Sequence, residues 1–251
     1  MFMDNVLHLG LTDSTNDDAY KLALDGAEHG FGVIADRQLA GKGRLGKAWA
    51  SPAGTGLYCS IIVRPKLSFI DFPKLTLTAG LALCRAVENL QINSSFGLKW
   101  PNDLYCNQRK CGGILVESSS ISYRKNESFV IVGIGLNVNT KLDQFQQELQ
   151  QKATSLHILS GDLYDLHDLY RIIHASLLDH IQIHEINGFS HIREEWSKKD
   201  VLFGKEMQWL TVEKQIVTAC GMGLDECGQL LARDRNGTIH EILSGDVQLA
   251  R

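Results

Sequence analysis

The stretch GKGRLGKAW at residues 41–49 most constrains the fold, because it lies between two strand-like segments and no helix can follow it. The apolar, β-branched segments at 31–36 and 56–63 each predict a short buried strand. The residues between them include Pro52 and repeated glycines, which interrupt any continuous helix. The sequence therefore predicts two strands joined by a long glycine-rich loop at 37–54.

Two familiar phosphate-binding patterns overlap in this loop. As G-x-x-x-x-G-K it is close to a P-loop, and as G-x-G-x-x-G it matches a dinucleotide fingerprint. Both need a helix that starts at the motif, and a P-loop also needs a hydroxyl where this chain has Ala48. What remains is either a cationic loop that approaches an anionic ligand or a solvated basic turn anchored by Trp49. This segment alone does not decide between them.

The predicted type of secondary structure changes twice along the chain. Strands and helices alternate up to about residue 141, helices follow, and short strand-like runs occupy the end, with turns predicted at 221–223, 225–228 and 235–237. We expect a catalytic domain at 1–203 and a small β-barrel domain at 204–251. The helices predicted by periodicity and capping are 15–27, 73–90, 143–151, 165–184 and 189–199. The further strands are 96–100, a hairpin over 103–118 that turns at Asn107–Gln108, and 128–139.

Composition excludes several classes of protein. The 251 residues carry a formal net charge of -4, so the chain has no general basic footprint for nucleic acid. The six cysteines form no C-x-x-C pair, and no N-terminal signal pattern or apolar run of about 20 residues occurs, so we expect a cytoplasmic protein that does not bind membranes. His180 and His184 are spaced i, i+4, but with no evident third ligand we expect no zinc site.

Three other segments carry polar residues next to glycines or prolines. These are KWPND at 99–103, RKCGGILVE at 109–117 and GIGLNVN at 133–139. Each has an ordinary structural explanation: a surface cation, a β-bulge, or close packing in a sheet. All of them fall on strand ends and loops of one predicted domain, however, and this clustering favours one shared site.

Taken together with STN at 14–16, Q-x-x-G-x-G-R at 38–44 and W-x-S-P-x-G-x-G-L-Y-x-S at 49–60, these motifs resemble those of biotin protein ligases. The resemblance follows the catalytic domain in order, and the small β-rich end fits the family too. It implies an α+β fold: a mixed or antiparallel sheet with flanking helices, like the class II synthetases, plus an SH3-like β-barrel. It also implies an enzyme that uses ATP, biotin and Mg²⁺ to make biotinyl-AMP and biotinylates a lysine of a biotin carboxyl carrier domain.

The resemblance assigns roles to individual residues. Catalysis is expected from Arg44, Lys110, Lys99 and Asp103, and Mg²⁺ is expected near Asp103 if a protein ligand holds it. The biotin-binding residues implied are Ser14, Thr15, Asn16, Gln38, Gly41, Lys42, Gly43, Arg44, Lys110, Gly113, Gly133 and Gly135. The ATP-binding residues implied are Lys42, Arg44, Lys47, Trp49 and Asn137, the last two on the adenine side.

The chain departs from the family at Lys42 and Lys47, where arginine is usual. A lysine keeps the charge but loses the planar donor fork, so we expect weaker retention of the adenylate. Only about 13 residues precede the STN motif, which leaves no room for the DNA-binding domain of some relatives, so we expect no direct DNA binding; a homodimer stays open. The rival interpretations are lipoate or octanoyl transfer, which needs no ureido contacts, and a biotin sensor, which needs no phosphate-binding residues.

Overall fold

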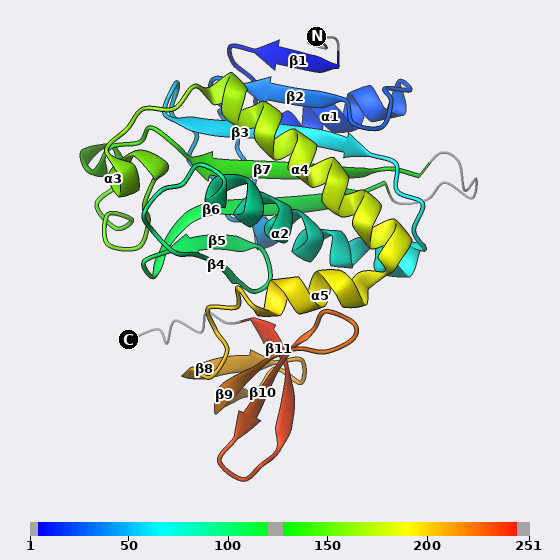
Figure 1. The fold of residues 1–251 in the computed structure, drawn as a ribbon, viewed down its shortest axis with the longest axis vertical. Helices are drawn as coiled ribbons and strands as arrows, with labels where there is room; N and C mark the ends of the chain where they lie inside the picture. Colours follow the sequence, from blue (N-terminus) through cyan, green and yellow to red (C-terminus); the bar gives the residue numbers. More distant parts are fainter. Residues whose placement is uncertain (1–4, 120–127, 245–251) are drawn as a thin grey trace.

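The computed structural model describes residues 5–119 and 128–244 (Figure 1). A seven-stranded sheet forms its centre, in the order β1-β2-β3-β7-β6-β5-β4. β1 pairs in parallel with β2, and every other neighbouring pair in this sheet is antiparallel. The strands are β1 (Val6–Leu9), β2 (Gly32–Ala35), β3 (Gly56–Val63), β4 (Phe96–Lys99), β5 (Asp103–Cys106), β6 (Arg109–Ser118) and β7 (Val130–Asn137).

The two faces of this sheet are covered differently. Helices α2 (Leu75–Glu88), α4 (Leu166–Asn187) and α5 (Phe189–Ser197) share one large apolar core with residues such as Ile114 and Ile134. Helix α1 (Thr15–Leu24) packs on the opposite face in a small core of Ala19, Ala23, Val33, Ile62, Phe129 and Ile131. Because side chains alternate along a strand, the central strands present apolar residues to the first face, and to the α1 face they present glycines and polar residues beside the apolar Ile62 and Ile131.

Four strands form a closed barrel after the helices: β8 (Glu206–Thr211), β9 (Ile216–Leu224), β10 (Leu230–Asp234) and β11 (Ile239–Ser244). Trp209 fills its interior, and its indole N–H donates to the carbonyl of Ala219 at 2.7 Å. The α+β class and the C-terminal barrel predicted from the sequence are therefore confirmed. Among the described residues, no helix combines the length and apolarity that a membrane crossing requires.

The predicted domain boundary at residue 203 stays a prediction, because contacts cross it. On the N-terminal side of this boundary, the backbone of β4 pairs with residues 199–201, which lead into the barrel, and Leu98 and Asp200 form a parallel bridge. The turn between β9 and β10 also docks on the sheet domain, since Trp100 Nε1 donates to the carbonyl of Gly228 at 3.0 Å. The barrel thus contacts the KWPND segment directly.

Some element predictions were wrong. Residues 143–151 do not form a helix: a short 3-10 turn at Leu142–Gln144 is followed by irregular backbone. Residues 221–223 are not a turn, because β9 runs through them to Leu224. The sequence reasoning also missed β1 and the short helix α3 (Leu156–Ser160), and it ended helix α1 three residues late. The hairpin turn at Asn107–Gln108 is confirmed, with positive φ at both residues.

Candidate active site

A cavity opens on the α1 face of the sheet, and its floor is made of glycines. Gly113 on β6 pairs directly with Gly135 on β7, and the indole of Trp49 packs on this pair. A Cβ on Gly135 would lie 2.4 Å from Trp49 Cε2, so no side chain fits there. The glycines are therefore needed for the close approach of the loop that carries Trp49.

A β-bulge turns Lys110 into this cavity. Lys110 opposes Tyr105 and Gly112 opposes Leu104, so Cys111 is the extra residue. Residues three apart on a regular strand face opposite sides of the sheet, but the extra residue places Lys110 on the same side as Gly113. The backbone of Lys110 is also held by residues 152–154, which pair with it as a parallel bridge.

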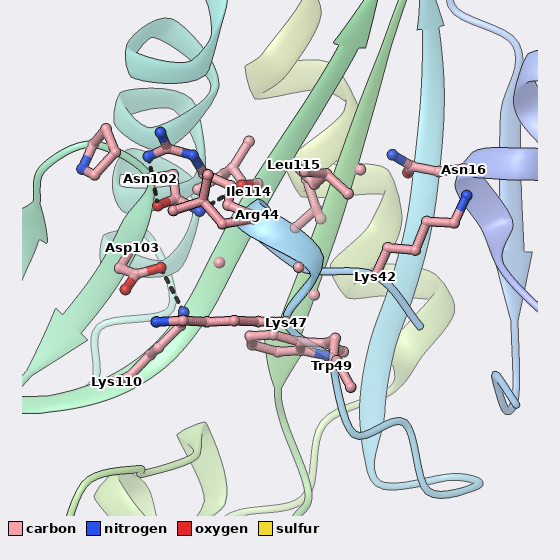
Figure 2. Close-up of a pocket in the computed structure, with 18 of the residues that line it drawn as sticks. Asn16, Lys42, Arg44, Lys47, Trp49, Asn102, Asp103, Lys110, Ile114 and Leu115 are labelled. Atoms are coloured by element: carbon pink, nitrogen blue, oxygen red, sulfur yellow. Dashed lines mark hydrogen bonds and ion pairs between the residues drawn. The ribbon is translucent and has the colours of Figure 1, made fainter. Parts of the chain in front are cut away.

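Lys110 is fixed by two neighbours. Its Nζ lies 2.5 Å from Asp103 Oδ1, and it also lies 5.3 Å from the centre of the Trp49 ring (Figure 2). In the sheet register, Asp103 opposes Gly113 on one side and Lys99 on the other, so it lies next to both the glycine floor and a second lysine. Lys99 also lies over the ring of Tyr105, at 5.3 Å.

A buried polar network forms the other end of the cavity, where helix α1 begins. Gln38 Oε1 accepts from the backbone N–H of Thr15 at 2.9 Å, and Gln38 Nε2 donates to Ser51 Oγ at 2.8 Å. Ser60 Oγ donates to Asn16 Oδ1 at 2.6 Å, while Asn16 Nδ2 donates to Glu117 Oε2 at 2.6 Å. These partners fix which end of each amide faces which way.

Ser14 occupies the position just before α1, but its hydroxyl makes no capping hydrogen bond and lines the cavity. Gly133 provides the space for Asn16, because a Cβ at this position would lie 2.1 Å from Asn16 Oδ1. Together with the amides of Asn16 and Gln38, this end offers buried donors and acceptors to a small polar group.

The loop of residues 41–49 is folded into a small hairpin over the cavity. Lys42 and Ala48 form an antiparallel bridge, and Trp49 N–H donates to the carbonyl of Gly41 at 2.8 Å. Figure 2 shows Lys42 extending toward Asn16, whereas Arg44 reaches in the other direction, where its Nη1 lies 3.5 Å from Asn102 Oδ1. Asn102 is itself bound to the backbone of Ile114 on β6.

The charge of the cavity is strongly positive. Of the described residues that line it, five are cationic and Asp103 is the one carboxylate, although the whole chain is net acidic. Burial lowers the pKa of the Arg44 guanidinium, and the charge of Asp103 partly offsets that effect. The indole N–H of Trp49 is buried and has no acceptor among the described residues. Excess positive charge and an unsatisfied donor suit an anionic ligand with further acceptors.

The structure brings most of the predicted site residues together. Those that line the cavity are Ser14, Thr15, Asn16, Gln38, Lys42, Gly43, Arg44, Lys47, Trp49, Lys99, Asp103, Lys110, Gly113, Gly133 and Gly135. Gly41 and Asn137 do not line it. Gly41 is buried under Trp49 and Ser51, and the Asn137 amide donates to the carbonyl of Thr154 at 3.0 Å. A direct contact between Asn137 and adenine thus stays a prediction.

Several contributors were missed as site residues, although most belong to the quoted motifs. Ser51 and Ser60 are in the W-x-S-P motif, Asn102 is in KWPND, and Glu117 ends the β6 motif. For Ser60 and Glu117, the available signal was a polar residue in a largely apolar strand segment; Ser51 and Asn102 lie in loops next to a proline of their motifs. Leu243 of the barrel also lines the cavity, and nothing in its local sequence indicates that.

Comparisons with known proteins agree with this geometry. Residues 9–137 match the biotin/lipoate A/B protein ligase family. The bifunctional ligase/repressor BirA of Bacillus spizizenii is 33% identical over 98% of this chain and 74% of its own length. The biotin–[acetyl-CoA-carboxylase] ligase of Mycobacterium tuberculosis is 31% identical, over 94% of this chain and 85% of its own.

Among solved structures, a biotin protein ligase from Aquifex aeolicus in complex with biotin and ATP superimposes with a TM-score of 0.81. It is 31% identical and covers 97% of both chains. Extended similarity in sequence and in structure accompanies a cavity assembled from the expected motifs. The chain belongs to the biotin/lipoate A/B protein ligase family.

Proposed function

We propose that the protein is an ATP-dependent biotin protein ligase. The observation that carries this is the junction, in one cavity, of a buried network of hydroxyls and amides with a cluster of cations. The network suits the ureido head of biotin, which needs both donors and acceptors. The cations suit the carboxylate of biotin and the phosphates of ATP, which must be brought together despite their like charges.

In the first step, a carboxylate oxygen of biotin attacks the α-phosphorus of ATP, and the bond to the β-phosphate oxygen breaks to release pyrophosphate. We assign Lys110 to the junction of carboxylate and α-phosphate, because the end of its side chain lies over Gly113 in the glycine floor of the cavity. Arg44, Lys47 and Lys99 then surround the phosphates. Their contribution is positioning and stabilisation of the charge that develops on the phosphate oxygens.

The donor set fits one Mg²⁺ ion bound mainly through substrate. Asp103 is a single, mostly buried carboxylate beside the cations, and Mg²⁺ in nucleotide sites commonly uses one or two carboxylates together with phosphate oxygens. We propose that Asp103 holds the ion, which neutralises phosphate charge when it is bound. Trp49 is assigned to the adenine side, where its free indole N–H can donate to the nucleotide.

In the second step, the ε-amine of an acceptor lysine attacks the acyl carbon of biotinyl-AMP, loses a proton, and AMP leaves. We propose that this lysine belongs to a biotin carboxyl carrier domain of a biotin-dependent carboxylase and that the reaction takes place in the cytoplasm. The proposal includes neither DNA nor membrane binding. A homodimer is compatible with it and is tested by sedimentation.

One experiment tests the proposal: incubation with labelled biotin, ATP, Mg²⁺ and a carrier domain, with Lys110→Ala as the comparison variant. We expect label on the acceptor lysine, dependent on ATP, and a large loss in the variant. Parallel reactions with lipoate and octanoate distinguish the rival transferases. Binding of biotin without transfer would identify a sensor, and label from lipoate alone would replace the biotin assignment.

A further inference from the structure

We propose that Asp17 is a positioning residue that anchors the hairpin of residues 41–49 over the cavity by holding Lys42. This inference rests on the proposed function, because the ligand that the hairpin retains is taken to be biotinyl-AMP. Asp17 lies in the first turn of helix α1 and forms an ion pair and hydrogen bond with Lys42.

The hairpin can transmit this anchoring because its own backbone is closed. The Lys42–Ala48 bridge is followed by a bond from Gly43 N–H to the carbonyl of Lys47 at 2.6 Å. Holding Lys42 therefore also positions Arg44 and Lys47, which carry the cations aimed into the cavity. Trp49 anchors the end of the hairpin by packing on the glycine floor, whereas the hydrogen bond from Arg44 to Asn102 is long at 3.5 Å and involves a cation assigned to the ligand. At the start of the hairpin, the Asp17 contact with Lys42 can persist when Arg44 turns to phosphate.

The charges around Lys42 support an anchoring role. The hydrogen bond to Asp17 raises the pKa of Lys42, and the nearby Glu117 adds to the effect. Glu117 is in turn held by Asn16. Lys42 is thus paired with Asp17, and Figure 2 shows it pointing toward the Asn16 side of the cavity. Its charge is largely matched by the protein itself.

The test measures the anchoring of the hairpin independently of enzyme activity. Hydrogen exchange of the backbone amides at 41–49 is measured without ligand in the wild-type protein, in Asp17→Asn and in the matched control Asp25→Asn. Asp25 is an exposed carboxylate at the other end of helix α1. Because exposed ion pairs contribute little each, we expect exchange to be about two- to fivefold faster in Asp17→Asn. The control should match the wild type.

Two further measurements identify the charge pair as the cause. The swapped variant Asp17→Lys/Lys42→Asp should restore slow exchange, whereas each single charge reversal should not. Raising the salt to about 1 M should bring the wild type toward Asp17→Asn, because an exposed pair is screened. With preformed biotinyl-AMP, Asp17→Asn should release the adenylate faster by a similar factor while the rate of adenylate formation at saturation changes less.

Two results would overturn the proposal that Asp17 anchors the hairpin, even if the enzyme is active. One is an unchanged exchange rate in Asp17→Asn, and the other is a swapped variant that does not recover the slow exchange of the wild type. If the wild-type protein makes no adenylate, the proposed function fails, and the exchange experiment without ligand still reports on the anchor. Faster exchange without faster adenylate release would limit Asp17 to a structural role and also overturn the proposal.

Discussion

Gly133 is the position where a single methyl group should have the largest effect on the biotin end of the site. A Cβ there would lie 2.1 Å from Asn16 Oδ1, 2.9 Å from Asn16 Cγ and 3.0 Å from Asn16 Nδ2. Asn16 is only 5% exposed and belongs to the first turn of α1, so its backbone cannot easily retreat. We predict that Gly133→Ala forces the Asn16 side chain out of its network.

The cost follows from the two hydrogen bonds that Asn16 would lose. The bond from Ser60 Oγ joins neutral groups and the bond to Glu117 Oε2 joins a charged one, both at 2.6 Å. Net contributions of about 1 kcal/mol and about 1.5–3 kcal/mol, respectively, give a loss of roughly 2.5–4 kcal/mol in the free energy of unfolding. If Asn16 also orients biotin, the affinity of Gly133→Ala for biotin should be lower than that of the wild type by about tenfold or more, and tenfold corresponds to about 1.4 kcal/mol.

Urea unfolding and calorimetric titration with biotin measure the two effects, and a double-mutant cycle isolates the cause. In an Asn16→Ala background the three nearest obstacles are gone, so Gly133→Ala should cost less than about 1 kcal/mol. A cost below about 1 kcal/mol in the wild-type background would refute the reasoning. So would an equal cost in both backgrounds, since the clash with Asn16 would then not be the cause.

Three further changes give independent expectations. Lys110→Ala should slow biotin-dependent pyrophosphate exchange by about 100- to 1,000-fold, because it removes a cation from the developing charge; a loss below tenfold would contradict that role. Lys42→Arg should slow the release of biotinyl-AMP in a chase experiment, because the guanidinium can donate two bonds to Asp17 or to phosphate; an unchanged rate would contradict it. Burial raises the pKa of Asp200 from 3.8 to about 6, so its stabilising contribution is present below about pH 4 and is lost as the pH rises through 6. Asp200→Asn should therefore be more stable than the wild type at pH 8, by on the order of 1–3 kcal/mol in urea unfolding, with the gain disappearing near pH 4.

The site residues could be predicted from the sequence where they belong to short local motifs. The glycine loop excluded a P-loop because no helix can follow it, and the structure shows a hairpin between β2 and β3. The glycines of β6 and β7 indicated close packing, and they do form the floor beneath Trp49. In these cases one residue type has few physical uses, so a short motif restricts the structure strongly.

Other features depend on residues that are distant in the sequence. Residues 143–151 carry good helix formers, yet the segment 152–154 that follows pairs with the backbone of Lys110 and fixes where the chain must go. This tertiary pairing overrides the helix propensity of residues 143–151. The partner of Lys42 was equally hidden, because Asp17 looks like an ordinary acidic residue in the first turn of a helix.

The contrast between a positive cavity and an acidic chain has a kinetic consequence. Because the described part of the chain lines the cavity with five cations and one carboxylate, the rest of the molecule is more acidic than the net charge of -4 indicates. ATP diffusing toward most of the surface is therefore repelled, and it is drawn in only near the opening. Such focusing raises productive encounter rates and weakens steeply with ionic strength. The association rate of ATP should thus report the electrostatic asymmetry of the whole molecule.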